Sequence, residues 1–487
     1  MKIILINPDL PPIVQNKIYS KLMLPVPPAG IACIAALLEK EGNKVVIIDQ
    51  YANKISNEQL IKKIDAEDPG IVGFSCLTPT IKNIENLVTQ IRGLHKDILI
   101  VLGNMHATVF SKEILEYKIA DVVVRGEGEH SMLEIVNALK EKRRFHHIKG
   151  IDFIDGNGEF VHNPDNEIEA DLDSLPYPAW HLFDLSLYKI HPLISSYEIT
   201  LPIQGSRGCP YKCIFCAQEK MFKKPRHRGN DNIISELEYL YVNFGVKRFT
   251  FIDAFFPFSI EQGLDFCDRL IKKGLHKKIK WIVETRVDKV DFKLLKKMKE
   301  AGLHLIMYGF EVGNQRILDS LNKMATVEQA RKAMKETKKN HILTTGLFVL
   351  GLPGETKETC KETIRFAKEI DCDIAKFNIA VPLPGSKLFE IYRNKVSKIE
   401  NPEHFTSWAS WFVNIDSLVY SPESITSEEL MDLQTEAMFK FYMRPKLILR
   451  YIIRGEFPVR KFCYGGWFLI IRYLKIIIAR IMNKTEF

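Results

Sequence analysis

Cys209-Pro-Tyr-Lys-Cys213-Ile-Phe-Cys216 is the stretch from which the fold is inferred. Its three cysteines follow a short apolar segment at 201–204 and have three and two residues between them. Three thiolates at this spacing can bind three irons of a [4Fe–4S] cluster, which leaves the fourth iron open to a small molecule. A structural zinc site is the alternative, but zinc normally needs a fourth Cys or His nearby, and His227 lies eleven residues further on.

Short apolar segments alternate with amphipathic helical segments on both sides of the cysteines. Alternation of this kind favours parallel sheets that bind ligands at the carboxyl ends of their strands. We therefore predict an α/β protein with an N-terminal Rossmann-like parallel sheet, a partial (β/α)6 TIM-like barrel and a helical C-terminal tail. The expected strands are 3–7, 45–49, 71–75, 98–103 and 121–124 in the first sheet, and 201–204, 248–252, 280–284, 305–310, 343–350 and 375–381 in the barrel.

A chain of 487 residues is too long for one ordinary domain. We expect a first domain at 1–145, a linker at 146–200, a barrel domain at 201–400 and a mostly helical C-terminal region at 401–487. The linker contains the proline-rich stretch Leu175-Pro-Tyr-Pro-Ala-Trp180. Nine cysteines, of which only three are grouped, argue against a secreted disulfide framework and favour the cytoplasm.

The Cys-x3-Cys-x-aromatic-Cys pattern resembles the signature of radical S-adenosylmethionine (SAM) enzymes. The resemblance implies that SAM binds the open iron and that one electron, from a flavodoxin- or ferredoxin-type donor, yields a 5′-deoxyadenosyl radical. It also places Phe215 beside the adenine, Glu311 near SAM at the end of the fourth barrel strand, and Gly351 in the glycine motif of the fifth. Relatives often carry two acids after the second strand, whereas only Asp253 stands here, either as a SAM contact or as an ordinary solvated residue.

Three loops in the first 140 residues resemble those of the cobalamin-binding domain that is often fused ahead of this barrel. They are Ser75-Cys-Leu77, Gly103-Asn-Met-His-Ala-Thr108 and Arg125-Gly-Glu-Gly-Glu129. The resemblance implies cobalamin contacts from Ser75, Leu77, Gly103, His106 and Thr108. No Asp-x-His-x-x-Gly motif is present, so we expect cobalamin to bind base-off, without a histidine below the cobalt. His106 stands on the wrong loop for a cobalt ligand, and its alternative role is to cap a loop.

The resemblance implies a radical SAM enzyme that methylates an unactivated carbon of a lipid-like or other secondary metabolite. The alternatives are a radical rearrangement, cyclisation or hydroxylation with the same cofactors, as in the relatives that act as anaerobic magnesium-protoporphyrin ester cyclases, and a non-catalytic cobalamin-binding regulator. A methylthiotransferase acting on RNA would need further grouped cysteines. No catalytic side chain is identified, and Trp408, Trp411 and Phe412 are either core residues or a substrate pocket.

The positive charge of the chain is concentrated at its C-terminal end. The net charge is +8, while residues 440–487 hold eleven Lys or Arg and two acids, so residues 1–439 carry about −1. A helix at 466–484 would have one basic side and one apolar side, which is typical of a segment lying on a membrane surface. We therefore expect peripheral contact with the inner face of the membrane. Packing on the barrel is the alternative, and no nucleic acid is expected.

Overall fold

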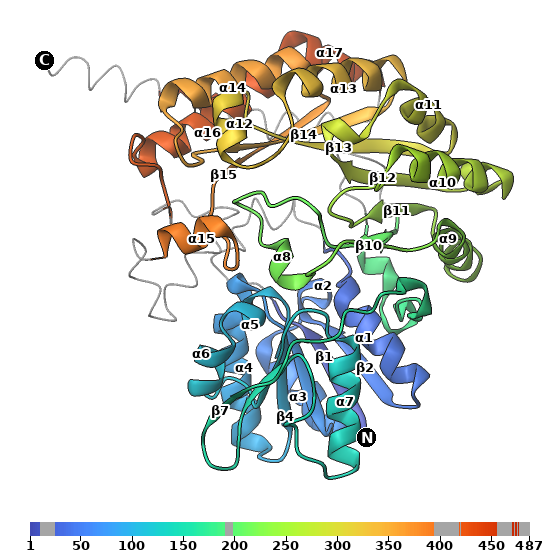
Figure 1. Cartoon of the computed structure of the whole chain (residues 1–487), viewed down its shortest axis with the longest axis vertical. Helices are drawn as coiled ribbons and strands as arrows, with labels where there is room; N and C mark the ends of the chain where they lie inside the picture. The colour runs from blue at the N-terminus through green and yellow to red at the C-terminus, as the bar shows by residue number, and fades with distance from the viewer. Residues whose placement is uncertain are drawn as a thin grey trace, which may run out of the picture.

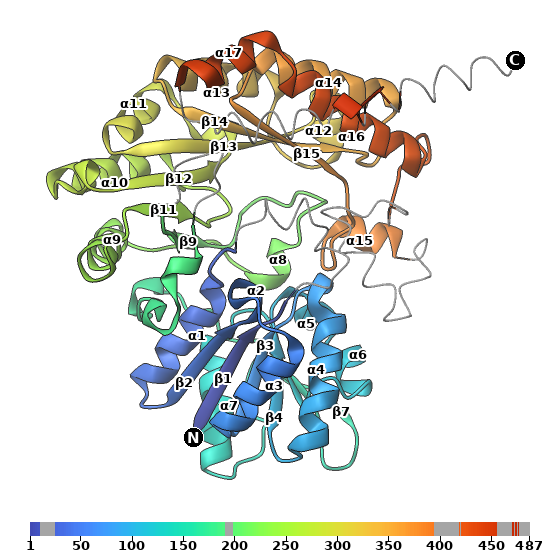
Figure 2. The same ribbon diagram turned by 180° about the vertical axis from the view of Figure 1, so that it is seen from behind.

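The computed structural model describes residues 1–9, 25–189, 198–393, 418, 420–454, 470–471, 473–474 and 476. It has two lobes, an N-terminal one built on a seven-stranded sheet and a second one built on a six-stranded sheet (Figure 1). The short helix α8, Gln218–Met221, lies between the lobes in both views (Figure 2). The predicted combination of two parallel α/β units is confirmed.

The first sheet has the order β2-β1-β3-β4-β5-β6-β7 among the described residues. Its parallel part consists of β1 (Lys2–Asn7), β2 (Lys44–Asp49), β3 (Ile71–Ser75), β4 (Leu99–Gly103) and β5 (Val122–Val124). These strands are apolar along their length because helices bury both faces of the sheet. One face packs against α1 (Ala29–Lys40) and α7 (Glu129–Lys140), the other against α3 (Asn57–Glu67) and α4 (Ile81–Leu94). The short helices α2 (Gln50–Asn53), α5 (Met105–Val109) and α6 (Ser111–Glu116) complete this lobe.

An antiparallel hairpin extends this sheet beyond β5. It consists of β6 (Ile151–Ile154) and β7 (Phe160–His162), which lie in the stretch expected to be a linker. The Asp155 carboxylate accepts hydrogen bonds from the backbone N–H groups of Asn157 (2.8 Å) and Glu159 (3.0 Å) and so closes the turn. Residues 151–162 are therefore part of the first sheet and not of a linker.

The second lobe is an open half-barrel of parallel strands in the order β15-β14-β13-β12-β11-β8. The strands are β8 (Thr200–Ile203), β11 (Arg248–Phe251), β12 (Lys280–Thr285), β13 (Leu303–Glu311), β14 (Leu343–Leu350) and β15 (Ile374–Ile379). The helices that connect them are α9 (Asn230–Phe244), α10 (Ile260–Lys272), α11 (Phe292–Glu300), α12 (Gln315–Ser320), α13 (Val327–Lys339) and α14 (Lys357–Ile370). All six strand positions predicted from the sequence are confirmed to within two residues.

Helix α16 (Ser427–Tyr442) lies along β15, the last strand of the half-barrel. The Tyr442 hydroxyl accepts a hydrogen bond from the Ala375 N–H (3.1 Å) and donates one to the Ala375 carbonyl (2.8 Å). The Gln434 amide donates to the carbonyl of Phe377 at 2.8 Å. Side chains of α16 thus satisfy backbone groups of β15 where a further strand would otherwise pair.

Helix α17 (Pro445–Arg454) turns its basic side toward the barrel. Arg450 bonds to Asp371 at 2.6 Å and to Asp373 at 3.2 Å, and Arg454 bonds to Asp373 at 2.8 Å. The exposed side is apolar instead, with exposed fractions of 57% for Leu449, 59% for Ile452 and 74% for Ile453. No helix within the described parts of the chain is long and apolar enough to cross a membrane. Trp408, Trp411, Phe412 and most of the predicted helix at 466–484 lie outside the described residues.

Candidate cofactor site

The three cysteines lie on a loop that leaves and rejoins a short antiparallel ribbon. The ribbon pairs β9 (Ser206–Arg207) with β10 (Arg226–His227). Gly208, at the start of the loop, has a φ of +83°, and a Cβ there would lie 2.6 Å from the carbonyl oxygen of Lys224. Only glycine fits this close approach, so the turn into the cysteine segment depends on it.

The barrel holds the middle of this cysteine loop by backbone contacts. The Ile214 N–H donates to the Leu321 carbonyl at 3.1 Å, and the Ile214 carbonyl accepts from the Leu388 N–H at 2.7 Å. Leu388 is the second residue of α15 (Lys387–Tyr392), which follows the sixth strand. The Asn322 amide also donates to the Lys212 carbonyl at 3.0 Å. These contacts explain why the cysteines sit at the mouth of the barrel.

The cysteine side chains fit an iron–sulfur cluster better than a single metal ion. Cys209 and Cys213 are half-buried, Cys216 is exposed, and all three line one cavity of about 1020 Å³. Burial raises the pKa of the Cys213 thiol to about 11, so binding of iron would have to displace its proton. No three Cys, His, Asp or Glu side chains among the described residues converge on one point. A cubane does not require such convergence, because each thiolate binds a different iron.

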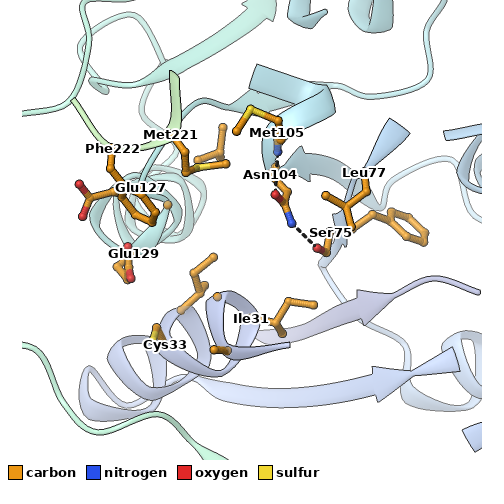
Figure 3. A pocket seen from close by; sticks show the side chains of 18 of the residues that line it. Ile31, Cys33, Ser75, Leu77, Asn104, Met105, Glu127, Glu129, Met221 and Phe222 are labelled. Atoms are coloured by element: carbon orange, nitrogen blue, oxygen red, sulfur yellow. Dashed lines mark hydrogen bonds between the residues drawn. The ribbon is translucent and has the colours of Figure 1, made fainter. Parts of the chain in front are cut away.

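A second cavity, of about 890 Å³, lies over the carboxyl ends of the first sheet and reaches the cysteine loop (Figure 3). Of the predicted cobalamin contacts, Ser75, Leu77 and Gly103 line it. Its wall is mostly apolar and includes Ile31, Phe74 and Met132. A Cβ on Gly73 would lie 2.9 Å from Leu5 Cδ2, so the strand surface at the base of the cavity has no room for a larger side chain there. An apolar slot beside glycines fits the base-off tail of cobalamin, which needs close approach to the sheet.

The two cavities meet at Cys216, which lines both of them. Gly126, Glu127, Gln218 and Met221 are likewise shared. The cluster site and the cobalamin cavity therefore adjoin at Cys216.

Asn104 replaces the second glycine of the expected loop and adopts the backbone conformation of a glycine, with φ +80° and ψ −176°. This conformation costs a non-glycine residue about 1–3 kcal/mol. The Asn104 amide compensates by donating to the Ser75 hydroxyl at 2.9 Å, and its side-chain oxygen accepts from the Met105 N–H at 2.7 Å (Figure 3). These two hydrogen bonds hold the loop at Asn104.

His106 is buried rather than presented to the cavity. Its exposed fraction is 1%, its Nδ1 lies 3.1 Å from the Thr78 hydroxyl, and burial lowers its pKa to about 3. None of the described residues that line the 890 Å³ cavity is a histidine. Thr108 lines the other cavity, and its hydroxyl accepts from the Gly126 N–H at 3.1 Å. Base-off binding, without a histidine below the cobalt, stays a prediction.

Glu311 ends β13 with a φ of +60° and forms a buried ion pair with Lys323, at 2.6 Å. Burial alone would lower the pKa of Lys323, but the Glu311 carboxylate raises it and keeps the ammonium charged. Glu311 influences the Cys213 thiol electrostatically, so it lies near the cluster site. Phe215 is half-buried and packs on the barrel core. Their contacts with SAM stay predictions.

Gly351 and Asp253, two further residues singled out from the sequence, both contact other parts of the protein. A Cβ on Gly351 would lie 2.4 Å from Leu430 of α16, so this glycine allows the C-terminal helix to approach. Gly351, like Phe215 and Glu311, lines neither cavity, and its predicted contact with the cofactor stays a prediction. Asp253 is buried and accepts hydrogen bonds from the Gly205 N–H (2.9 Å) and the Ser206 hydroxyl, so the solvated alternative is wrong.

Four charged residues of the site were not singled out from the sequence. Glu127 and Glu129 follow β5, and they pair with Arg207 and Arg226 at the base of the cysteine loop. The signal was the Arg125-Gly-Glu-Gly-Glu129 stretch, but nothing local in the sequence indicates its partners.

Comparison with known proteins agrees with this geometry. The B12 binding domain family matches residues 17–136, and the Radical SAM superfamily matches residues 203–367. An uncharacterised methyltransferase of Pyrococcus horikoshii is 32% identical over 92% of this chain and 94% of its own length. The chain belongs to the cobalamin-binding radical SAM enzymes. Its cofactors are a [4Fe–4S] cluster, SAM and cobalamin, and a non-catalytic regulator is set aside.

A second relative and a solved structure are also similar to this radical SAM enzyme. The anaerobic magnesium-protoporphyrin IX monomethyl ester cyclase of Cereibacter sphaeroides is 32% identical over 90% of this chain and 70% of its own. The solved structure of the radical SAM methyltransferase TsrM from Kitasatospora setae, with cobalamin and a [4Fe–4S] cluster bound, has a TM-score of 0.67 at 18% identity. It covers 82% of this chain and 78% of its own. At this identity TsrM supports the fold alone.

Proposed function

We propose that this enzyme methylates an unactivated carbon of a small molecule, with a lipid-like or other secondary metabolite as its substrate. When bound, the cluster and SAM supply a radical that removes a hydrogen atom, and cobalamin supplies the methyl group. The observation that carries the proposal is the junction of the two cavities at Cys216. A substrate held there would lie between both cofactors, and the surrounding protein would exclude water. The name of the Pyrococcus horikoshii relative also favours methylation.

The proposed roles of individual residues are those that the family resemblance implies. We assign Cys209, Cys213 and Cys216 to the cluster, Phe215 and Glu311 to SAM, and Ser75, Leu77 and Gly103 to cobalamin. The electron would come from a flavodoxin- or ferredoxin-type donor.

The second candidate is cyclisation with the same cofactors, which the likeness to the magnesium-protoporphyrin ester cyclase favours. Product mass separates the two candidates. The anaerobically reconstituted enzyme should be incubated with lipid and small-molecule extracts of producing cells, with a Cys209→Ala protein as the control. A product heavier than its precursor by one methyl group supports methylation. A product with an unchanged carbon count and a new ring contradicts it.

We further propose that the C-terminal region contacts an anionic membrane surface. The support is the +9 surplus of residues 440–487 and the exposed apolar side of α17. Arg444, Arg450 and Arg454 are held by Asp371 and Asp373, so the contact would rest on Leu449, Ile452, Ile453 and the lysines and arginines beyond residue 454.

Sedimentation with phosphatidylserine-containing vesicles at low salt tests this contact. The full-length protein should pellet, and a protein truncated after Arg454 should pellet less. This truncation keeps α16 and α17, so the barrel edge stays covered. An Ile452→Ser/Ile453→Ser variant should also lose binding. If neither change reduces pelleting, or if the full-length protein stays in the supernatant, the membrane proposal is rejected.

A further inference from the structure

The ribbon that carries the cysteine loop places two arginines side by side at the base of that loop. Arg207 on β9 is the direct register partner of Arg226 on β10, and the loop between them holds all three cysteines. The two side chains are 6% and 9% exposed. Two buried guanidinium groups so close together would repel each other unless carboxylates lie between them.

Glu127, from the other lobe, supplies a carboxylate to both arginines. Its Oε2 accepts from Arg207 Nη1 at 2.6 Å, and its Oε1 accepts from Arg226 Nη2. Glu129 Oε1 accepts from Arg207 Nη2 at 2.5 Å. One side chain of the N-terminal lobe therefore bonds to the strand that enters the cysteine loop and to the strand that leaves it.

The loop around Glu127 is fixed to its own lobe and approaches the cysteine loop closely. The Glu127 carbonyl accepts from the Asn166 amide at 2.8 Å. Gly126 has a φ of +66°, and a Cβ there would lie 3.3 Å from the carbonyl oxygen of Met221, at the end of α8. Glu127 and Arg207 also line the 890 Å³ cavity. Glu127 therefore borders the cobalamin cavity (Figure 3) and also bonds to both ends of the cluster-bearing segment.

We propose that Glu127 is a positioning residue that sets the distance and orientation between the cluster and cobalamin. A change in its carboxylate removes the one side chain that bonds to both Arg207 and Arg226. Glu129 then holds Arg207 alone, while Ile214 and Asn322 still hold the middle of the loop to the barrel. Both cofactors are then retained, but their relative placement is no longer unique. This inference rests on the cofactors and holds whether the enzyme methylates or cyclises its substrate.

The test compares Glu127→Gln, which removes the charge, with Glu127→Asp, which keeps it on a shorter side chain. Glu236→Gln is the matched control, because Glu236 is a buried carboxylate that pairs at 2.5 Å with Arg228, two residues past Arg226, within the barrel lobe. Iron, sulfide and cobalamin content are measured first. The distance between the reduced cluster and cob(II)alamin is then followed by pulsed EPR, and hydrogen exchange is followed in residues 208–225.

Glu127→Gln should keep both cofactors, broaden the distribution of cluster–cobalt distances and speed hydrogen exchange in 208–225 at least about tenfold, which corresponds to about 1.4 kcal/mol. Glu127→Asp should fall between Glu127→Gln and the native protein, and Glu236→Gln should match the native protein in the distance distribution. An unchanged distribution in a fully loaded Glu127→Gln protein overturns the proposal. Selective loss of cobalamin also overturns it, because Glu127 would then be a cobalamin contact. If Glu127→Gln does not fold, the same measurements are made on Arg226→Lys, which keeps the positive charge but has a shorter side chain. An unchanged distance distribution or a selective loss of cobalamin in that variant likewise overturns the proposal.

Discussion

Replacing Glu311 with alanine is expected to have two effects, on folding and on SAM binding, which a second substitution separates. The Glu311–Lys323 pair is buried, with side-chain exposures of 10% and 11%. Removal of one partner of such a pair leaves an uncompensated charge and costs about 3–5 kcal/mol of stability. If Glu311 also accepts a charge-assisted hydrogen bond from SAM, its loss weakens binding by about 1.5–3 kcal/mol, which is roughly tenfold to 150-fold in Kd.

The Glu311→Ala/Lys323→Met double variant removes both charges and should recover most of the lost stability. Urea unfolding of the cofactor-free proteins measures stability, and calorimetric titration of the anaerobically reconstituted proteins measures SAM affinity. Lys323→Met alone controls for the loss of the ammonium. Stability that recovers while SAM affinity stays low supports a direct contact. A double variant that binds SAM within twofold of the native protein refutes the contact, and an unchanged urea midpoint for Glu311→Ala refutes the account of the ion pair.

Three further changes have expected outcomes. Cys209→Ala should abolish the brown chromophore and SAM cleavage, and formation of 5′-deoxyadenosine at the native rate would contradict the cluster assignment. His106→Ala should leave a base-off cobalamin spectrum unchanged, because the ring is buried away from the cavity, whereas loss of a nitrogen-ligated signature would make His106 a ligand. Asp253→Asn should stabilise the cofactor-free protein above pH 7. Burial raises the pKa of Asp253 from 3.8 to about 7, so stability present below pH 3.8 falls by up to about 4 kcal/mol as the pH rises to 7. The advantage of asparagine should shrink between pH 7 and pH 4, and a difference in urea midpoints that does not depend on pH would contradict this.

The strands of both sheets could be predicted because each is a short apolar run bounded by turn residues, and this pattern is local. The hairpin β6–β7 was not predicted because its strands are three and four residues long and surround a Gly-Asn-Gly turn that resembles a linker. The spacing of the cysteines predicts a cluster site, and the structure brings all three to one cavity. Glu127 could not be paired with Arg207, since 80 residues separate them and no periodicity connects them.

The orientation of the C-terminal helix α17 also depends on contacts between residues that are distant in the sequence. Helical periodicity indicates that α17 has a basic side and an apolar side, but it does not say which side packs on the protein. The partners of the arginines, Asp371 and Asp373, stand more than 70 residues earlier in the chain. The acidic residues of the barrel therefore reverse the orientation that the charge pattern alone favours.

The hydrogen bonds from Tyr442 and Gln434 to β15 limit how this enzyme can be divided or recombined. A barrel that ended near residue 400 would expose the outer backbone groups of β15, and these would be free to pair with the same edge of another molecule. Such a fragment should self-associate through its edge rather than behave as an independent catalytic module. A chimera that exchanges the C-terminal region between relatives would have to carry hydrogen-bond donors and acceptors equivalent to those of residues 427–442. Without them, the chimera would aggregate, whatever its substrate range.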